Sequence, residues 1–538
     1  MRPRSAEARN ADELDLIRAR RSRERPVDLD ARPVAEHARV ALVYPSPYRA
    51  GMSSLGFQTL YGLLNRAGVP THRAFLPDAW EPMALAWPQP RRRVVTYEAE
   101  RPISDYPILG LSVAYELEIA GVIRMLEGTG IPLLAADRGP RDPIVIGGGP
   151  LTFANPSCLL PFVDVLICGE AEDLLLQVIR ALDGGGGRST AIAAACAIEG
   201  VLPGERTPGV WPSLPKPARA SPEHLPARSA ILTPDAELSD MLLVEPERGC
   251  SRRCTFCVLR RDVVGGMRIL DMERPLSQIP AHARRVGLVG AAVTDHPQLL
   301  PLVAAIVESG REIGISSLRA DRLTPELCRL LRESGHRTLT VASDGISERM
   351  RSLLHRKIHA PSLVHAAELA RAHGYHRLKV YQMIGAPEET EDDVDELIRF
   401  ALELAKIHRL TLTFSTFVAK RNTPLDGQPF VGVKEAERRL KKIRAGLRGR
   451  VELRPQSPRW AHVEYLLAQR GADSGHAAIR AVHAGARYAD WVRAFEETPA
   501  VARPLRFGDE EAWARRKGKA ARRPALPIVH DAAPRSPE

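Results

Sequence analysis

Residues 247–257 read Glu-Arg-Gly-Cys-Ser-Arg-Arg-Cys-Thr-Phe-Cys and place three cysteines within eight positions. The chain has 538 residues and only seven cysteines, so this clustering is not an effect of composition. The spacing of Cys250, Cys254 and Cys257 lets one curled loop present three thiolates to an iron–sulfur cube. The fourth iron would then lack a protein ligand and be open to a small molecule. We therefore expect an iron–sulfur site with one open iron.

Three other uses of these cysteines stay open. A zinc site needs a fourth Cys or His at short spacing, whereas His282 and His296 lie far along the chain. A cluster with four protein ligands would need a distant donor such as Cys168 or Cys328. Buried structural thiols would not need this spacing. For any metal site, we expect the neighbouring arginines to help keep the thiolates deprotonated; they are Arg248, Arg252 and Arg253.

Strands alternate with helices from the cysteine stretch to about residue 430. The expected strands are Leu242–Val244, Val286–Val293, Ile313–Leu318, Thr338–Ala342, Leu378–Ile384 and Thr411–Phe417. Helix starts are marked by Thr324-Pro325-Glu326 and by Thr390 with Asp393, which has capping-box spacing. Six β/α units in about 175 residues are too few for a closed eight-fold barrel and predict a partial one.

A separate strand–helix series precedes the cysteines. Its expected strands are Val40–Tyr44, Ile108–Val113, Ile144–Ile146 and Val163–Cys168, and its expected helices include Leu55–Leu64 and Ile119–Leu126. Strands that alternate with helices imply a parallel sheet. Gly147–Pro150 and Gly169–Glu172 follow two of the strands, at the carboxyl edge where such sheets bind ligands.

The predicted fold class is α/β, with a Rossmann-like parallel sheet, a partial (β/α)6 barrel and a helical extension. The expected parts are an Arg-rich arm (1–38), the sheet domain (39–183), a Pro/Gly-rich linker (184–235), the barrel (236–430), a helical region (431–503) and a disordered basic tail (504–538). A chain of 538 residues is too long for a single core.

The composition of the chain excludes some classes of protein. With 44% hydrophobic and 26% charged residues, the chain is neither disordered nor fibrous. Residues 1–25 lack the apolar stretch of a signal peptide and no run of apolar residues is long enough to span a membrane, so we expect a cytoplasmic protein without membrane contact. The net charge of +11 includes basic segments at 434–450 and 515–523. These segments are typical of a nucleic-acid or acidic-lipid contact, or of a solvated helix face with a loose tail.

The cysteine spacing, with Phe256 before the last cysteine at the opening of a partial barrel, resembles the radical S-adenosylmethionine (SAM) superfamily over residues 240–425. The resemblance implies that Cys250, Cys254 and Cys257 hold a [4Fe–4S] cluster. It also implies that the open iron binds the amino and carboxylate groups of SAM, which is cleaved reductively to a 5′-deoxyadenosyl radical. A low-potential electron donor such as flavodoxin or ferredoxin would be a partner.

The same resemblance implies a set of SAM contacts near the ends of the barrel strands. Phe256, Met383, Ile384 and Gly385 would lie by the adenine, Gly290 and Ala291 by the methionine part, Arg319 by the carboxylate, and Ser343 and Asp344 by the ribose. The glycine segment Leu288–Ala292 carries no acid of its own, unlike the family's usual motif.

The segments Tyr44–Phe57 and Phe417–Pro424, with the two glycine loops, resemble a radical SAM subgroup that has an N-terminal B12-binding-like Rossmann domain. Cobalamin is thus a third expected cofactor. The residues that would line its surface are Ser112, Gly147, Gly148, Gly149, Gly169 and Glu170. The Asp-x-His-x-x-Gly signature of a histidine-ligated cobalt is absent. Either cobalamin binds without a protein histidine, or the domain only gates the barrel.

We expect a cobalamin-assisted radical SAM enzyme, with methyl transfer to carbon as its reaction. One alternative is a methylthiotransferase-like enzyme acting on RNA or protein, because Gly385–Thr390 is similar; Cys158, Cys168 and Cys196 would then have to hold a second cluster. The other alternative is a nucleic-acid-binding protein whose cluster is structural.

Overall fold

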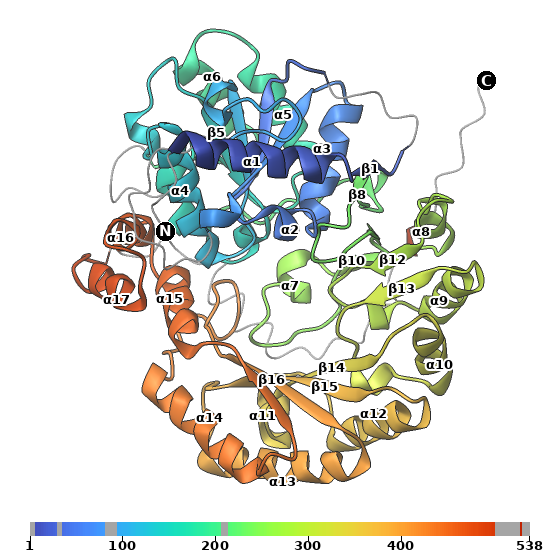
Figure 1. The fold of residues 1–538 in the computed structure, drawn as a ribbon. Helices are drawn as coiled ribbons and strands as arrows, with labels where there is room; N and C mark the ends of the chain where they lie inside the picture. Colours follow the sequence, from blue (N-terminus) through green and yellow to red (C-terminus); the bar gives the residue numbers. More distant parts are fainter. Residues whose placement is uncertain (1–5, 29–34, 81–93, 206–213, 501–527, 530–538) are drawn as a thin grey trace.

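A computed structural model describes residues 6–28, 35–80, 94–205, 214–500 and 528–529. The chain folds as an N-terminal sheet domain that faces a partial barrel, and helices after the barrel run back toward the sheet domain (Figure 1). The predicted fold class is confirmed. None of the described helices has the length and apolarity to cross a membrane.

The N-terminal domain is built on a six-stranded sheet. Its strand order is β3 (Thr71–Phe75), β2 (Val40–Tyr44), β4 (Ile108–Ser112), β5 (Ile144–Gly148), β6 (Val165–Ile167) and β7 (Val201–Pro203), and only β7 runs antiparallel. The helices are α2 (Tyr48–Gly51), α3 (Leu55–Arg66), α4 (Ile119–Thr129), α5 (Glu172–Leu182) and α6 (Arg188–Cys196). Every residue of β2, β3 and β4 is buried, as expected of a sheet covered on both faces.

Two segments expected outside this domain join it. In the arm, α1 (Ala6–Arg21) buries Ile17, and Arg20 donates to Asp78 at 2.6 Å and to Tyr97 at 3.1 Å. The linker contributes α6 and the edge strand β7, and its β8 (Ile231–Leu232) pairs with β1 (Arg25–Pro26). Both segments are therefore part of the folded body.

The barrel is an arc of two parallel sheets. The first holds β13 (Glu312–Ile315), β12 (Arg285–Leu288) and β9 (Met241–Val244); the second holds β14 (Thr338–Gly345), β15 (Arg377–Ile384), β16 (Leu410–Thr416) and β17 (Glu452–Pro455). A bridge between Leu318 and Val341 joins them. The helices are α8 (Glu273–Ser277), α9 (Leu299–Glu308), α10 (Pro325–Glu333), α11 (Glu348–Leu353), α12 (Ala360–Ala372) and α13 (Glu391–Ile407).

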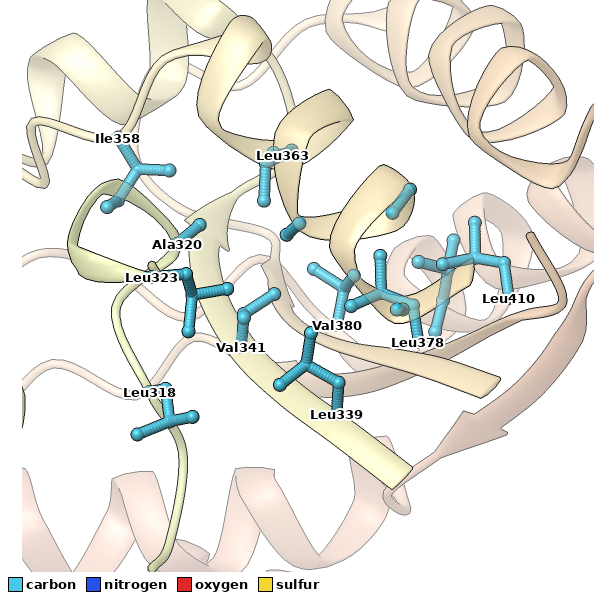
Figure 2. Packing of buried hydrophobic residues seen from close by; sticks show 14 of the residues in the cluster. Leu318, Ala320, Leu323, Leu339, Val341, Ile358, Leu363, Leu378, Val380 and Leu410 are labelled. Carbon is cyan, nitrogen blue, oxygen red and sulfur yellow. The ribbon is translucent and has the colours of Figure 1, made fainter. Parts of the chain in front are cut away.

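Alternate residues of these strands face the helices. Figure 2 shows Leu339 and Val341 of β14 beside Leu378 and Val380 of β15, under Leu363 of α12. The intervening residues therefore face the concave side of the arc. β17 adds a seventh strand to the six expected.

The C-terminal helices close the molecule into a ring. They are α14 (Val433–Leu447), α15 (Pro458–Gln469), α16 (Asp473–His483) and α17 (Tyr488–Glu496). Val482, Trp491 and Phe495 share one hydrophobic cluster with Leu159 and Phe162 of the N-terminal domain. The expected disordered tail lies outside the described residues except for β18 (Ile528–Val529), which pairs in parallel with β11 (Met267–Leu270).

Candidate functional site: the cysteine loop and the cavity beside it

The cysteine loop directly follows β10 (Glu247–Gly249), which pairs with β11 in a short two-stranded ribbon. Gly249 has a φ of 88°, and a Cβ atom there would lie 2.3 Å from the carbonyl oxygen of Gly266. Only glycine fits this left-handed position against a neighbouring backbone. The turn directs Cys250 out of the ribbon, and the loop ends in α7 (Arg261–Val264).

All three cysteines of the loop are free thiols. Cys250 and Cys254 are buried, and the backbone N–H of Arg252 points at Sγ of Cys250 from 3.4 Å. Burial raises the pKa of Cys250, with a further contribution from Cys254, and burial raises the pKa of Cys257 to about 11. The metal-free thiols of Cys250 and Cys257 are therefore protonated near neutral pH, and a bound metal would displace those protons.

The thiol spacing bears on the zinc alternative. Among the described residues, the group of three candidate ligand atoms lying within 4.8 Å of one another is Asp173, Glu223 and His224. The three cysteines form no such group. A tetrahedral zinc with bonds of 2.3 Å holds sulfurs about 3.8 Å apart.

Two of the loop arginines also pair with carboxylates, which the sequence analysis did not predict. Arg248 forms a bidentate pair with Glu245, with donor–acceptor distances of 2.7 and 2.8 Å, and donates to Glu172 at 2.6 Å. Arg252 pairs with Asp295 through two hydrogen bonds of 2.7 and 2.5 Å. Nearby carboxylates bind these two guanidinium groups. The spacing of the loop alone did not predict those ion pairs.

A cavity of about 460 Å³ lies between the carboxyl edge of the N-terminal sheet and the cysteine loop. It brings together residues that the sequence assigned to two different cofactors. Ser112, Gly149, Gly169 and Glu170 line one part, and Gly290 and Ala291 line another. Its walls also include Leu55, Leu60, Phe153, Leu259, Val264 and Val289. The cavity is mainly apolar, which suits an organic ligand.

The glycines at the sheet edge act in different ways. Gly149 has a φ of 104°, and a Cβ atom there would lie 2.5 Å from the carbonyl oxygen of Val113. Gly147 instead faces Val163 and Leu159 of the domain core, and Gly148 lies beside Ile167. Neither is among the residues lining the cavity. Of the three consecutive glycines, Gly149 is the one that the structure brings to the cavity.

The sequence analysis missed Glu247, which lines the cavity beside Gly290. Its side chain is wholly buried, and one carboxylate oxygen accepts the backbone N–H of Ala292 at 2.8 Å. The other oxygen is buried and has no hydrogen-bond partner among the described residues. Burial raises the pKa of Glu247 to about 8. A Cβ atom on Gly290 would lie 2.2 Å from this carboxylate, so the glycine makes room for it.

The guanidinium group of Arg319 also has only part of its hydrogen-bonding capacity filled. Its Nη2 atom donates to Asp321 at 2.8 Å, while Nε and Nη1 are buried without a partner among the described residues. Buried unsatisfied donors are costly, and a ligand carboxylate would satisfy them. This geometry fits the carboxylate role that the resemblance implied.

The remaining predicted SAM contacts are not among the residues lining this cavity; apart from Phe256 in the cysteine loop, they lie near the carboxyl ends of β14 and β15. Ser343 is wholly buried and its hydroxyl donates to the carbonyl of Gly345 at 3.1 Å, while Asp344 pairs with Arg356 at 2.6 Å. The backbone N–H of Gly385 donates to both carboxylate oxygens of Glu389 at 3.0 Å, which fixes the segment after Met383 and Ile384. Phe256 packs against the barrel core.

The cysteines and the basic segment that favoured the two alternative functions contact other parts of this chain. Cys158 and Cys168 are buried in the N-terminal core, and Cys196 lies on α6; burial raises the pKa of Cys168 to about 12. In the segment 434–450, Arg438 and Lys442 pair with Glu391 of α13. The segment 515–523 lies outside the described residues.

Comparison with known proteins supplies the family. Residues 244–401 match the radical SAM superfamily, and residues 56–202 match the N-terminal region of radical SAM proteins. An uncharacterized protein of Methanocaldococcus jannaschii is 26% identical over 422 residues, covering 75% of this chain and 83% of its own length. An uncharacterized methyltransferase of Pyrococcus horikoshii is 22% identical over 274 residues, which cover 48% of this chain and 58% of that protein.

Among solved structures, the radical SAM methyltransferase TsrM from Kitasatospora setae, with tryptophan substrate and a SAM analogue bound, superposes with a TM-score of 0.50. The identity is 17%, over 74% of this chain and 76% of TsrM, so the likeness concerns the fold. The two family matches, with the loop of Cys250, Cys254 and Cys257 inside the second of them, show that the chain belongs to the radical SAM superfamily.

Proposed function

We propose that Cys250, Cys254 and Cys257 hold a [4Fe–4S] cluster at which SAM is cleaved reductively, and that cobalamin assists a methyl transfer. The observation that carries the proposal is the shared cavity, because it joins the N-terminal sheet edge to Gly290 and Ala291 beside the cysteine loop. In the enzyme, the cluster with SAM would supply a 5′-deoxyadenosyl radical, and cobalamin would carry the methyl group.

Arg319 and Glu247, which each have polar atoms without a hydrogen-bond partner among the described residues, fit the amino-acid end of SAM. Arg319 offers two unpartnered guanidinium nitrogens to a carboxylate, and Glu247 offers an unpartnered carboxylate oxygen to an ammonium group. Glu247 lies against Gly290 and so places an acid beside the segment Leu288–Ala292, which has none of its own. The carboxylate that the sequence analysis found missing would thus come from β10.

The cobalamin part of the proposal rests on the cavity walls and on the relatives. Apolar and glycine residues make up most of the wall, which also holds Glu170, Glu172, Glu245, Glu247 and Arg248, and among the described residues lining the space there is no histidine. The described cavity wall would therefore offer cobalamin no imidazole, in keeping with the absent sequence signature. The names of two relatives, the P. horikoshii protein and TsrM, support methyl transfer as the reaction.

The test begins with anaerobic reconstitution of the full chain with iron, sulfide and hydroxocobalamin, followed by desalting. A visible spectrum shows which cofactors are retained, and dithionite with SAM is then added and 5′-deoxyadenosine is measured. We expect both a cluster and a corrin spectrum, and formation of 5′-deoxyadenosine. Formation of 5′-deoxyadenosine without a retained corrin would remove cobalamin from the proposal.

A pair of cysteine variants tests the ligand assignment. Cys250→Ala removes one thiolate ligand and should abolish both cluster assembly and SAM cleavage. Cys328→Ala is a matched control, because Cys328 is a buried free thiol of α10 and is not in the loop. It should retain wild-type iron. Circular dichroism checks the fold of both variants, and full iron in the Cys250 variant would contradict the assignment.

A further inference from the structure

Five charged side chains meet where the N-terminal domain contacts the cysteine loop. Glu170 lies just before α5 and Glu172 is its first residue, Glu245 precedes β10, Arg248 lies on β10, and Arg268 lies on β11. Each of these side chains is at most 14% exposed. Such a network is buried enough for its charges to act on their surroundings with little screening.

The contacts run continuously across the domain boundary. Arg248 donates to Glu172 at 2.6 Å and to Glu170 at 3.3 Å, and it binds Glu245 in a bidentate manner. Arg268 donates to Glu170 at 2.6 Å and to the carbonyl of Ala220 at 2.8 Å. Glu170 also accepts the N–H of Ala220 at 2.7 Å, so the linker is bound to the same network.

The network adjoins the cysteine loop along the chain. Arg248 and Arg268 lie opposite each other in the ribbon of β10 and β11, and Gly249 alone separates Arg248 from Cys250. Three carboxylates against two guanidinium groups leave one excess negative charge there. The position of the loop and the electrostatic potential around it therefore depend on side chains of the other domain.

We propose that Glu170 and Glu172 are positioning residues that, by holding Arg248, set how readily the cluster on the adjacent loop is reduced. This inference rests on the proposed function, because it presumes a cluster on Cys250, Cys254 and Cys257. It gives the loop Gly169–Glu172, which the sequence assigned to cofactor binding, a second role. The N-terminal domain thereby tunes the reduction potential of a cluster that the barrel binds.

The sign of the effect follows from charge. Reduction adds an electron to the cluster, so nearby carboxylates oppose reduction and a nearby guanidinium favours it. Glu172→Gln removes a negative charge and keeps the side chain's shape, and the reduction potential should rise. Arg248→Met removes the positive charge and should lower the potential. General loosening of the loop would not produce opposite shifts from two partners of one contact.

The experiment is a redox titration of the reconstituted full chain, followed by electron paramagnetic resonance. At a fixed potential, we expect Glu172→Gln and Glu170→Gln to raise the ratio of reduced to oxidised cluster about tenfold, which for one electron is about 59 mV. Arg248→Met should change this ratio in the opposite direction. Arg248→Lys keeps the charge and should stay near wild type.

The control is Glu326→Gln, which removes the same charge from an exposed ion pair on α10. It should leave the potential unchanged. The inference is wrong if the clusters of both glutamate variants have the same reduction potential as the cluster of this control. It is also wrong if both glutamate variants lower the reduction potential. If Arg248→Met assembles no cluster, the reduction potentials of the two glutamate variants still test the inference. A wild-type protein without a cluster would instead overturn the proposed function, which separates the two failures.

Discussion

At the scale of single residues, burial decides the ionisation of several carboxylates. Glu118 is 4% exposed and accepts hydrogen bonds from Ser46 at 2.8 Å and from the N–H of Ala114 at 2.6 Å. Burial outweighs these hydrogen bonds and raises the pKa of Glu118 from 4.5 to about 7. The folded state thus holds a proton that the unfolded state has released between these two values.

This shift predicts a stability that falls as the pH rises. The raised pKa stabilises the fold fully below pH 4.5, and the contribution is lost through pH 7, a change of about 3 kcal/mol. Glu118→Gln stays neutral and should be more stable than wild type at pH 8, with the difference absent at pH 5. Urea midpoints at both pH values measure this. An equal effect at both would contradict the assigned cause.

Single residues also show what the sequence could and could not predict at the site. The cysteine spacing was sufficient to single out the loop, because the three thiols of the proposed cluster site lie close along the chain. Glu247 was missed because its role depends on the N–H of Ala292 and on Gly290, which are more than forty positions away. The capture of Arg248 by Glu172 was missed for the same reason. Distant partners leave no local signal.

At the scale of elements, α13 shows a cap that the sequence predicted. Asp393 accepts the N–H of Thr390 at 2.8 Å and the hydroxyl of Ser347 at 2.6 Å, and it pairs with Arg349. Although partial burial opposes ionisation, these hydrogen bonds lower the pKa of Asp393 to about 2. The carboxylate also lies at the positive end of the helix dipole.

Asp393→Ala should therefore destabilise the barrel by about 1–3 kcal/mol, because the helix loses its cap and Arg349 loses its partner. Asp392→Ala, at an exposed position of the same first turn, is the control and should cost under about 0.5 kcal/mol. The shift of the thermal midpoint compares the two. Equal shifts would mean that the cap contributes little.

The sequence predicted most parallel strands within two or three residues, since they are short apolar runs. The strand β3 was missed because its letters, Thr-His-Arg-Ala-Phe, are mostly polar. Its buried polar side chains have partners elsewhere. His72 bonds to Tyr106 at 2.6 Å, and Arg73 pairs with Glu24 and Glu98 at 2.7 Å each. Such pairing offsets the cost of burial, and hydropathy alone does not detect it.

At the scale of the whole molecule, one lysine joins three parts of the fold. Lys420 follows the last predicted barrel strand and forms ion pairs of 2.7 Å with Glu116 of the N-terminal domain and Glu464 of α15. Lys420→Met would leave two carboxylates together and should destabilise the protein by about 3–5 kcal/mol. Thermal unfolding measures this loss.

Lys406→Met, which breaks an exposed pair with Glu403, should change stability by less than about 0.5 kcal/mol. The double variant Lys420→Met with Glu116→Gln should recover part of the loss, because one unpaired charge is gone. No recovery would show that Lys420 stabilises the junction through packing rather than charge.

The return of α16 onto the N-terminal domain has a consequence for synthesis on the ribosome. Gly475 of α16 packs against the carbonyl of Cys158, and Ala477, Ala481 and Val482 bury part of the first domain's apolar surface. Roughly 300 residues must be translated between these contacts, which takes about 15–60 s at 5–20 residues per second. During that interval the nascent N-terminal domain exposes a hydrophobic patch, and it is a natural client for a ribosome-associated chaperone.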